Sequence, residues 1–295
     1  MPLQPVVEMA SRARAEGYAI GYFEAWNLES LYGVVEAAER ARAPVFIGFN
    51  GEFLSRPERA AAERLSWYGA LGKAAAADAK VPCGLVFNEC SRDDWTRAAA
   101  TAGFNLVMPA DSAASYEDYR RRVGDLVRYA RPLGVAIEAE LGELPSGEAG
   151  FSHGEGEKTD AELARAFVEA TGVDLLAVSV GNVHGALAGR AALDLERLKS
   201  IRRLIDVPLV LHGGTGIADE SLREAVALGV AKVNYGAGLK LRYLEAVRRA
   251  LASDEANPHA LLGMGGPEDA MIAGRRAVRE AVAERLPALG CAGRA

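Results

Sequence analysis

The chain has 295 residues and a formal net charge of −6, with half of its residues hydrophobic and a quarter charged. This composition supplies a packed core, and its acidic balance excludes a general nucleic-acid binder, which needs a basic face. No apolar run approaches the length of a membrane span, so we expect no membrane partner.

Short apolar, β-branched segments alternate with segments of helical periodicity along the whole chain. The predicted strands are residues 18–23, 44–50, 83–88, 105–108, 135–140, 175–180, 209–212 and 231–235. The predicted helices are residues 28–42, 59–79, 116–131, 160–171, 193–205 and 219–228. We expect Thr159 to cap the helix that follows it, and four glycines to end helices before the next strand. These glycines are Gly103, Gly134, Gly172 and Gly229.

Eight strands with intervening helices predict an α/β fold, a (β/α)8 TIM barrel, in one domain over residues 1–295. A doubly wound sheet is the alternative, but the glycine-rich turn typical of a dinucleotide site is missing after Phe23. Residues 239–295 exceed what the barrel needs. We expect them to form a C-terminal helical extension that packs on a neighbouring subunit.

The start of the chain and the cysteines bear on location. Residues 1–17 mix charged and apolar side chains and are unlike a secretory signal. The three cysteines, Cys83, Cys90 and Cys291, are an odd number and are unlike a disulfide framework. We expect a cytoplasmic protein.

Two histidines end apolar runs and are each followed by glycine: His184 before Gly185, and His212 before Gly213. Both fall at carboxyl ends of predicted barrel strands, where TIM barrels place their active sites. Glu89, after the third strand, adds a carboxylate to the same ring. Two imidazoles and a carboxylate predict a catalytic zinc site, and also suit iron(II), manganese or cobalt. The alternatives are histidines bonded to backbone carbonyls, and a glutamate placed at a helix entry for the helix dipole.

Further polar residues follow the strands that end near these histidines. Glu140, at the end of the fifth strand, is predicted to accept a ring N–H from a ligating histidine. The turn Gly213, Gly214 and Thr215 leads into a helix and predicts a phosphate site, with Asn234 on the same side of the barrel. The alternative for this stretch is a glycine turn that only reverses the chain.

These motifs occur in an order that resembles the class II, zinc-dependent ketose-bisphosphate aldolases, in the branch that acts on tagatose or fructose 1,6-bisphosphate. The two histidine motifs and Asn234 carry the resemblance together with further stretches along the chain. These stretches are residues 17–23, 27–29, 43–45, 103–104, 107–108, 135–142, 167–174, 232–234 and 290–294.

The resemblance implies a mechanism. His184 and His212 would be zinc ligands, joined by a third histidine from a His-x-Asp-His motif on the third strand. Zinc would hold dihydroxyacetone phosphate and stabilise its enediolate. Glu148 is the best match for the glutamate that moves the proton, and the aspartate of the motif would serve the aldehyde oxygen. The resemblance also implies a homodimer or homotetramer and a sugar phosphate as small-molecule partner.

The chain departs from this family pattern at the catalytic motif, which here ends in Asn88 and Glu89. Asn88 has no proton to give near neutral pH, and Glu89 would weaken zinc as a Lewis acid. Other departures are Thr215 for serine, Ala237 for threonine, Asn50 for serine and Glu24 for asparagine. A carboxylate at Glu24 that faces the pocket would repel phosphate and favour a hydroxyl or an amine.

Three functions remain open on these residues. The first is a metal-dependent aldolase or lyase of carbohydrate metabolism, with specificity shifted away from fructose and tagatose 1,6-bisphosphate. The second is a non-catalytic subunit that binds a sugar phosphate or a protein partner. The third is an isomerase or epimerase that uses the same enediolate and needs no acid for an aldehyde.

Overall fold

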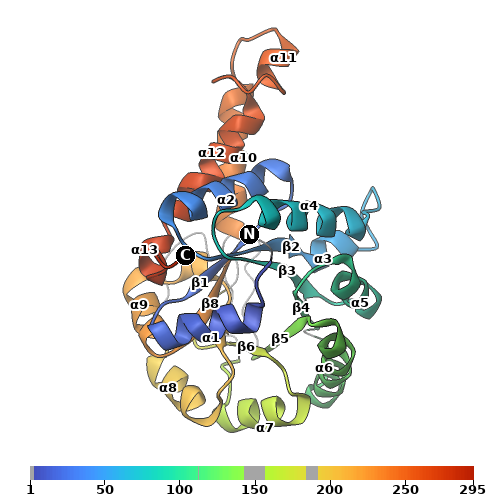
Figure 1. Cartoon of the computed structure of the whole chain (residues 1–295), viewed down its shortest axis with the longest axis vertical. Helices are drawn as coiled ribbons and strands as arrows, with labels where there is room; N and C mark the ends of the chain where they lie inside the picture. The colour runs from blue at the N-terminus through green and yellow to red at the C-terminus, as the bar shows by residue number, and fades with distance from the viewer. Residues whose placement is uncertain (1–2, 112, 143–156, 184–191) are drawn as a thin grey trace.

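The strands form a closed parallel barrel, in the order in which they occur in the chain. The computed structural model describes residues 3–111, 113–142, 157–183 and 192–295. The barrel consists of β1 (Ile20–Glu24), β2 (Val45–Asn50), β3 (Cys83–Cys90), β4 (Leu106–Pro109), β5 (Ala136–Leu141), β6 (Leu175–Val178), β7 (Leu209–Leu211) and β8 (Val230–Tyr235). Because β8 pairs with β1, the barrel has no free edge. The predicted TIM barrel is confirmed (Figure 1).

Helices surround the barrel and cover the outer face of its strands (Figure 1). They are α1 (Val6–Glu16), α2 (Leu28–Ala41), α3 (Gly51–Ser55), α4 (Leu65–Asp78), α5 (Asp93–Ala102), α6 (Tyr116–Ala130), α7 (Ala161–Thr171), α8 (Leu195–Leu204), α9 (Asp219–Ala227), α10 (Ala237–Leu251), α11 (Pro258–Leu261), α12 (Ala270–Ala283) and α13 (Leu286–Leu289). The described residues also form the short 3₁₀ helices η1 (Arg131–Leu133) and η3 (Gly214–Gly216).

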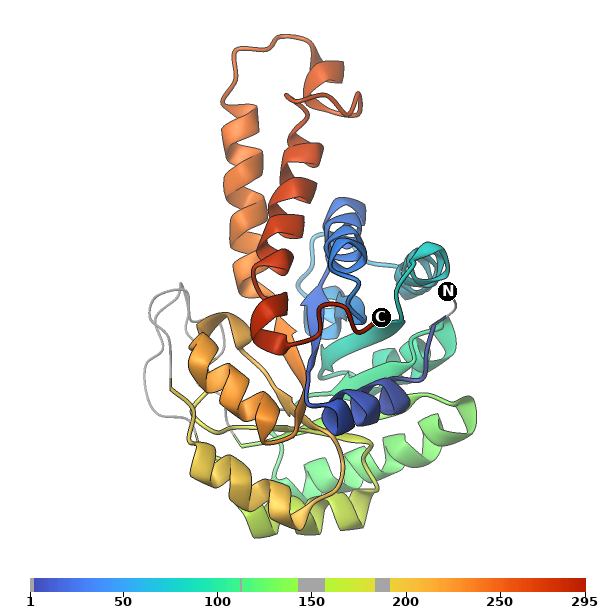
Figure 2. The same ribbon diagram turned by 60° about the vertical axis from the view of Figure 1, so that its left-hand side comes forward.

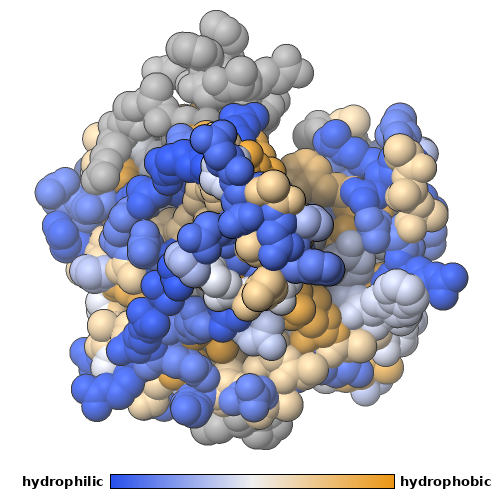
Figure 3. Space-filling model, turned by 90° about the horizontal axis from the view of Figure 1, so that it is seen from above, coloured by the Kyte–Doolittle hydropathy of each residue, from blue (hydrophilic) through white to orange (hydrophobic). Residues whose placement is uncertain are grey.

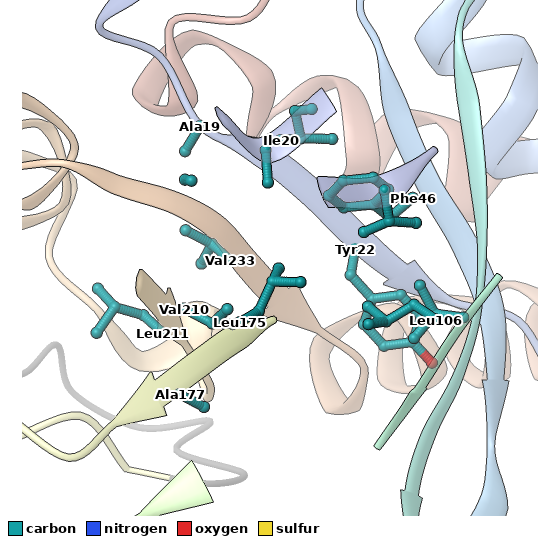
Figure 4. Close-up of a cluster of buried hydrophobic side chains, with 14 of the residues drawn as sticks. Ala19, Ile20, Tyr22, Phe46, Leu106, Leu175, Ala177, Val210, Leu211 and Val233 are labelled. Carbon is teal, nitrogen blue, oxygen red and sulfur yellow. The ribbon is translucent and has the colours of Figure 1, made fainter. Parts of the chain in front are cut away.

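The core occupies both faces of the barrel wall. Figure 4 shows buried side chains from β1, β2, β4, β6, β7 and β8, which lie on both faces of the wall because successive side chains of a strand point to opposite faces. They include Tyr22, Phe46, Leu106, Leu175, Val210 and Val233, all buried. A strand that is buried on both faces needs continuous apolar sequence, which explains the unbroken runs in the sequence.

The last helices leave the barrel as a protruding hairpin. Helices α10 and α12 pack against each other, α11 lies at the tip, and α12 also packs on α2 (Figures 1 and 2). Gly33 of α2 allows this close approach, because a Cβ there would lie 2.7 Å from the carbonyl oxygen of Arg275. The hairpin and α2 therefore form one packed unit beside the barrel.

The N-cap of α7 differs from the prediction. Asp160, not Thr159, caps this helix, by accepting a hydrogen bond from the backbone N–H of Leu163 at 2.9 Å. The Thr159 hydroxyl is already used, since it donates to the carbonyl of Leu141 and accepts from the N–H of Ser179 at 2.8 Å. Thr159 thus ties the end of β5 to the end of β6.

Gly103 and Gly172 end helices in the left-handed conformation, as predicted. The three cysteines are free and buried. Across the part of the chain that the structure describes, every helix is too short or too polar to cross a membrane.

Candidate active site

His212 lies at the centre of the site, directly after β7, with a side chain that is fully buried. Its Nε2 lies 2.9 Å from Oε1 of Glu138, and its Nδ1 lies 3.1 Å from Oε1 of Glu89. Oε1 of Glu140 is 3.9 Å from the same Nδ1. Glu138 therefore holds the ring at Nε2, and the carboxylates of Glu89 and Glu140 face the ring at Nδ1.

Glu138, which contacts His212, also forms a buried ion pair that the sequence motifs did not indicate. Lys232 of β8 places its Nζ 2.8 Å from Oε2 of Glu138, and both side chains are fully buried. Lys232 also donates to the side-chain oxygen of Asn234 at 2.6 Å. Since a buried charge is tolerated only when it is paired, Glu138 serves two cations at once: Lys232 and the imidazole of His212.

Glu89 reaches His212 because the backbone bends there. Its φ is +50°, and the register between β3 and β4 shifts between Phe87 and Cys90. A bulge of this kind re-aims a side chain, and the left-handed conformation of a non-glycine residue costs about 1 kcal/mol. Contacts offset that cost, since Asn50 donates to Oε2 of Glu89 at 2.8 Å while Oε1 faces His212. Strain of this kind is concentrated at functional sites.

Asn88 and Asn234 join β3 to β8 across the barrel mouth. The Asn234 amide donates to the side-chain oxygen of Asn88 at 3.3 Å, and both residues are buried. Because Asn234 also accepts from Lys232, a chain of polar contacts runs from Glu138 through Lys232 and Asn234 to Asn88. Asn50 has a structural task besides its contact with Glu89, since its side chain caps α3.

The charges of this cluster shift the pKa values of its members. Burial lowers the pKa of His212, but the surrounding carboxylates of Glu140, Glu138 and Glu89 outweigh burial and raise the pKa to about 10. Burial raises the pKa of Glu138, but Lys232 and His212 outweigh it and lower the pKa. The carboxylates around the ring therefore favour a positive charge at this position.

The glycine turn after His212 packs tightly on β8. Gly213 has a φ of +67°, which favours glycine. A Cβ on Gly214 would lie 2.7 Å from the Tyr235 ring. Thr215 lies against Gly238, at the beginning of α10. The turn itself thus requires its first two glycines, whether or not it also binds an anion.

Glu24 places its carboxylate at the beginning of α10. A Cβ on Gly236, the N-cap of that helix, would lie 2.5 Å from Oε2 of Glu24, and Lys240 forms an ion pair with Oε1. Burial raises the pKa of Glu24; Lys240 opposes this and the charge of Glu89 adds to it. Glu24 therefore belongs to the same electrostatic cluster as Glu89.

A cavity of about 770 Å³ opens beside the His212 cluster. Glu89 and Glu140 line it, together with Leu141 of β5 and residues that follow β2, β3, β4 and β5. The backbone N–H of Glu140 donates to the Tyr119 hydroxyl at 3.2 Å, which in turn donates to the carbonyl of Pro109 at 3.0 Å. Space for a substrate thus adjoins the imidazole and both carboxylates.

The predicted residues His184, Gly185 and Glu148 lie outside the described residues. Among the residues that are described, no three His, Cys, Asp or Glu side chains are spaced as a complete metal site. The donor types do fit a divalent cation, because an imidazole nitrogen and carboxylate oxygens face one another where His212 meets Glu89 and Glu140.

Sequence reasoning missed Glu138, Lys232 and Asn182. The Asn182 side chain donates to the carbonyl of His212 at 3.1 Å and so ties the ends of β6 and β7. The sequence did contain a sign of Glu138 and Lys232, since each is a charged residue within a strand that was expected to be buried. Charged residues at such positions are nearly always paired.

A family model and a known relative match this chain over nearly its whole length. The family model described as "Fructose-bisphosphate aldolase class-II" matches residues 4–294. The YdjI protein of Escherichia coli (strain K12) is 32% identical over 284 residues, which is 94% of each chain.

Two solved structures have the same fold over nearly the whole chain. The crystal structure of the YdjI aldolase from Escherichia coli K12 superposes with a TM-score of 0.81 at 31% identity and covers 100% of both chains. That of a putative fructose-1,6-bisphosphate aldolase from Coccidioides immitis gives 0.83 at 28% identity, and covers 98% of this chain and 97% of its own. The chain belongs to the class II fructose-bisphosphate aldolase family.

Proposed function

We propose that this chain is a metal-dependent aldolase that reversibly cleaves a carbon–carbon bond of a ketose phosphate or a related sugar. Its specificity is shifted away from fructose and tagatose 1,6-bisphosphate. The observation that carries the proposal is the convergence of His212, Glu89 and Glu140 beside a cavity at the carboxyl end of the barrel strands.

His212 through Nδ1 and Glu89 through Oε1 would hold the metal, with Glu140 beside them and His184 as the further predicted ligand. Zinc fits this donor set, and so do other divalent transition metals. When bound, the cation would act as a Lewis acid that stabilises the negative charge of an enediolate. Glu138 would accept the N–H at Nε2 of His212, and so fix the ring with Nδ1 toward the cavity.

The proton transfers need other groups of the chain. Asn88 can only orient a substrate oxygen through its amide, because an amide does not exchange a proton near neutral pH. Glu148 remains the proposed base for the carbon-bound proton. The loss of an acid at position 88 would slow release of an ordinary aldehyde by about two to four orders of magnitude. This favours a substrate that differs from fructose bisphosphate.

The proposed anion site is the turn from Gly213 to Thr215, near the beginning of α10. Backbone N–H groups at a helix beginning attract a phosphate. Glu24 opposes this attraction, since its carboxylate already lies at Gly236 and pairs with Lys240. Asn234 is occupied by Lys232 and Asn88, so it would orient the reacting end of the substrate rather than its phosphate.

We also propose a homodimer or homotetramer. The protruding hairpin exposes apolar side chains along α10 and near its tip, among them Leu241, Leu244, Leu251, Leu262 and Met264. Figure 3, which looks down on the molecule from the side of the hairpin, shows hydrophobic residues among hydrophilic ones on this face. A second copy that covers these side chains would remove apolar surface from water.

The test has two readouts on the zinc-loaded protein. Exchange of the carbon-bound protons of dihydroxyacetone phosphate with deuterium from solvent reports the first half of the reaction. Cleavage of ketose phosphates reports the whole. Aldolase activity requires both, and a chelator should remove both. Exchange together with isomerised or epimerised product, and no cleavage, would favour the third function, while absence of both would favour a binding subunit.

A further inference from the structure

The cavity beside His212 has a strongly acidic wall. Its described lining holds six carboxylates and one ammonium group. The carboxylates are those of Glu52, Glu89, Asp111, Glu140, Glu157 and Asp160. Two of them, Glu89 and Glu140, also face Nδ1 of His212, so the acidic wall begins at the reacting centre and extends away from it.

The cation of this wall is already engaged. Lys158 points its Nζ to the Asp194 carboxylate, 3.1 Å away, and Asp194 is outside the lining. Arg122 lies 3.5 Å from Asp111 but is shared with Asp93 at 2.5 Å. Within the described wall, a phosphate would therefore meet six carboxylates and a single lysine, whose charge is shared with Asp194.

Carboxylate and carbonyl oxygens accept hydrogen bonds, and hydroxyl and ammonium groups donate them. The wall is thus chemically matched to a donor-rich group without negative charge.

We propose that the aldehyde half of the substrate, which this cavity receives, bears hydroxyl or amino groups and no phosphate. The assignment of the cavity to that half rests on the proposed aldolase function. The charge argument does not depend on the aldolase function, because it concerns only which chemical groups the wall can bind. A substrate with a phosphate at the other end of its chain, or with none, satisfies this inference.

Equilibrium binding of unreactive analogues tests the inference without requiring turnover. The zinc-loaded protein is titrated calorimetrically with three four-carbon compounds: a polyol, its terminal amine and its terminal phosphate. Inorganic phosphate is present at a fixed low concentration in all three titrations, so that it fills the proposed anion site at residues 213–215. We expect the amine to bind at least about tenfold more tightly than the phosphate at low salt, with the polyol between them. The difference should shrink as ionic strength rises, because exposed charges are screened.

Charge variants of the wall sharpen the test. Glu157→Lys should lower the affinity for the amine and raise that for the phosphate, each about fivefold. Asp111→Asn should also lower the affinity for the amine and raise the affinity for the phosphate, each by a smaller factor. The matched control is Glu220→Lys, on the highly exposed face of α9 outside the cavity, which should change neither affinity.

The outcomes separate this inference from the proposed function. Preferential binding of the phosphate, or binding of none of the three analogues, would overturn the inference even if cleavage were found. Preference for the amine or polyol that responds to Glu157→Lys would support it, even if deuterium exchange and cleavage were both absent.

Discussion

His212 and Glu138 lie 2.9 Å apart, Nε2 to Oε1, with both side chains fully buried. The same carboxylate holds Lys232 at 2.8 Å. Burial lowers the pKa of Lys232, and the charge of Glu138 opposes that effect. Glu138 thus has two tasks that can be separated by mutation: it compensates a buried ammonium group, and it orients the imidazole that faces the cavity.

The first prediction concerns these two tasks. Glu138→Gln leaves a buried ammonium without a counter-charge and should destabilise the fold by about 3–5 kcal/mol, measured by urea unfolding. It should also weaken zinc binding by about 10- to 100-fold, as loss of an outer partner of a ligating histidine does.

The double variant Glu138→Gln with Lys232→Met separates the effects. It removes both buried charges, so it should recover part of the lost stability but none of the zinc affinity. Equal recovery of both quantities would contradict the assigned role of Glu138 at His212.

The sequence predicts the barrel well because each strand is buried on both faces. Its apolar run is then nearly independent of tertiary detail, and each strand was placed to within about two residues. Helices were predicted less well. The helix expected over 59–79 begins only at Leu65. In the segment before it, the Arg59 guanidinium donates to the carbonyls of Phe53 and Ala61.

The short helix α3 and the helices α1 and α5 were not predicted. The N-caps of α1 and α5 are Pro5 and Arg92, neither of which makes a side-chain capping bond. Without a capping residue, the usual signal for the start of a helix is missing.

Parts of the site depend on geometry that a sequence does not display. Strand ends predicted that His212 and Glu89 share one edge of the barrel. The contact itself depends on the left-handed backbone at Glu89, which favours glycine and has no signal in a glutamate. The link from Asn234 to Asn88 joins residues 146 positions apart.

The second prediction concerns the metal. His212→Ala should abolish zinc binding and activity. Glu89→Gln should weaken zinc binding by more than about 100-fold, which exceeds the loss expected for an outer partner. Elemental analysis and competition with a chromophoric chelator measure both. His259→Ala, on the exposed α11, is the matched control and should keep full zinc content. Full activity of a metal-stripped preparation would refute the metal-dependent mechanism.

The third prediction concerns Glu24. Glu24→Gln removes a buried carboxylate from the beginning of α10 and leaves Lys240 without its ion-pair partner. Inorganic phosphate should then bind about tenfold more tightly, as measured by calorimetry. Glu29→Gln, in the first turn of α2, is the control. An unchanged phosphate affinity in Glu24→Gln would mean that no anion site lies at this end of the barrel.

The fourth prediction concerns the hairpin. Leu262 and Met264 are 53% and 67% exposed near its tip. If a second copy covers them, replacing both by aspartate should convert the oligomer to a 31.2 kDa monomer in light scattering. Leu133→Asp places the same charge at an exposed leucine of η1 and should leave the oligomer intact. A wild-type protein that is monomeric at micromolar concentration would argue against the proposed assembly.

The last prediction concerns the attachment of the hairpin to the barrel. Glu36 of α2 forms ion pairs with Arg275 and with Arg279, the latter at 3.6 Å, and Arg40 is a further nearby cation. Burial raises the pKa of Glu36, but these arginines outweigh burial and hold it below its ordinary value of 4.5. Because the folded pKa is depressed, the ion pairs stabilise the protein fully above that ordinary value.

Their contribution is lost as the pH falls through the lower pKa of the folded state. Glu36→Gln should therefore lower the free energy of unfolding near neutral pH by about 1 kcal/mol. Its difference from the wild type should shrink as the pH falls below the ordinary carboxyl value of 4.5. Urea unfolding at a series of pH values measures this difference. The control is Glu280→Gln, at a more exposed glutamate on α12, which should lower the free energy of unfolding by less. If the difference in unfolding free energy between Glu36→Gln and the wild type stayed constant into acid, packing rather than charge would hold α12 on α2.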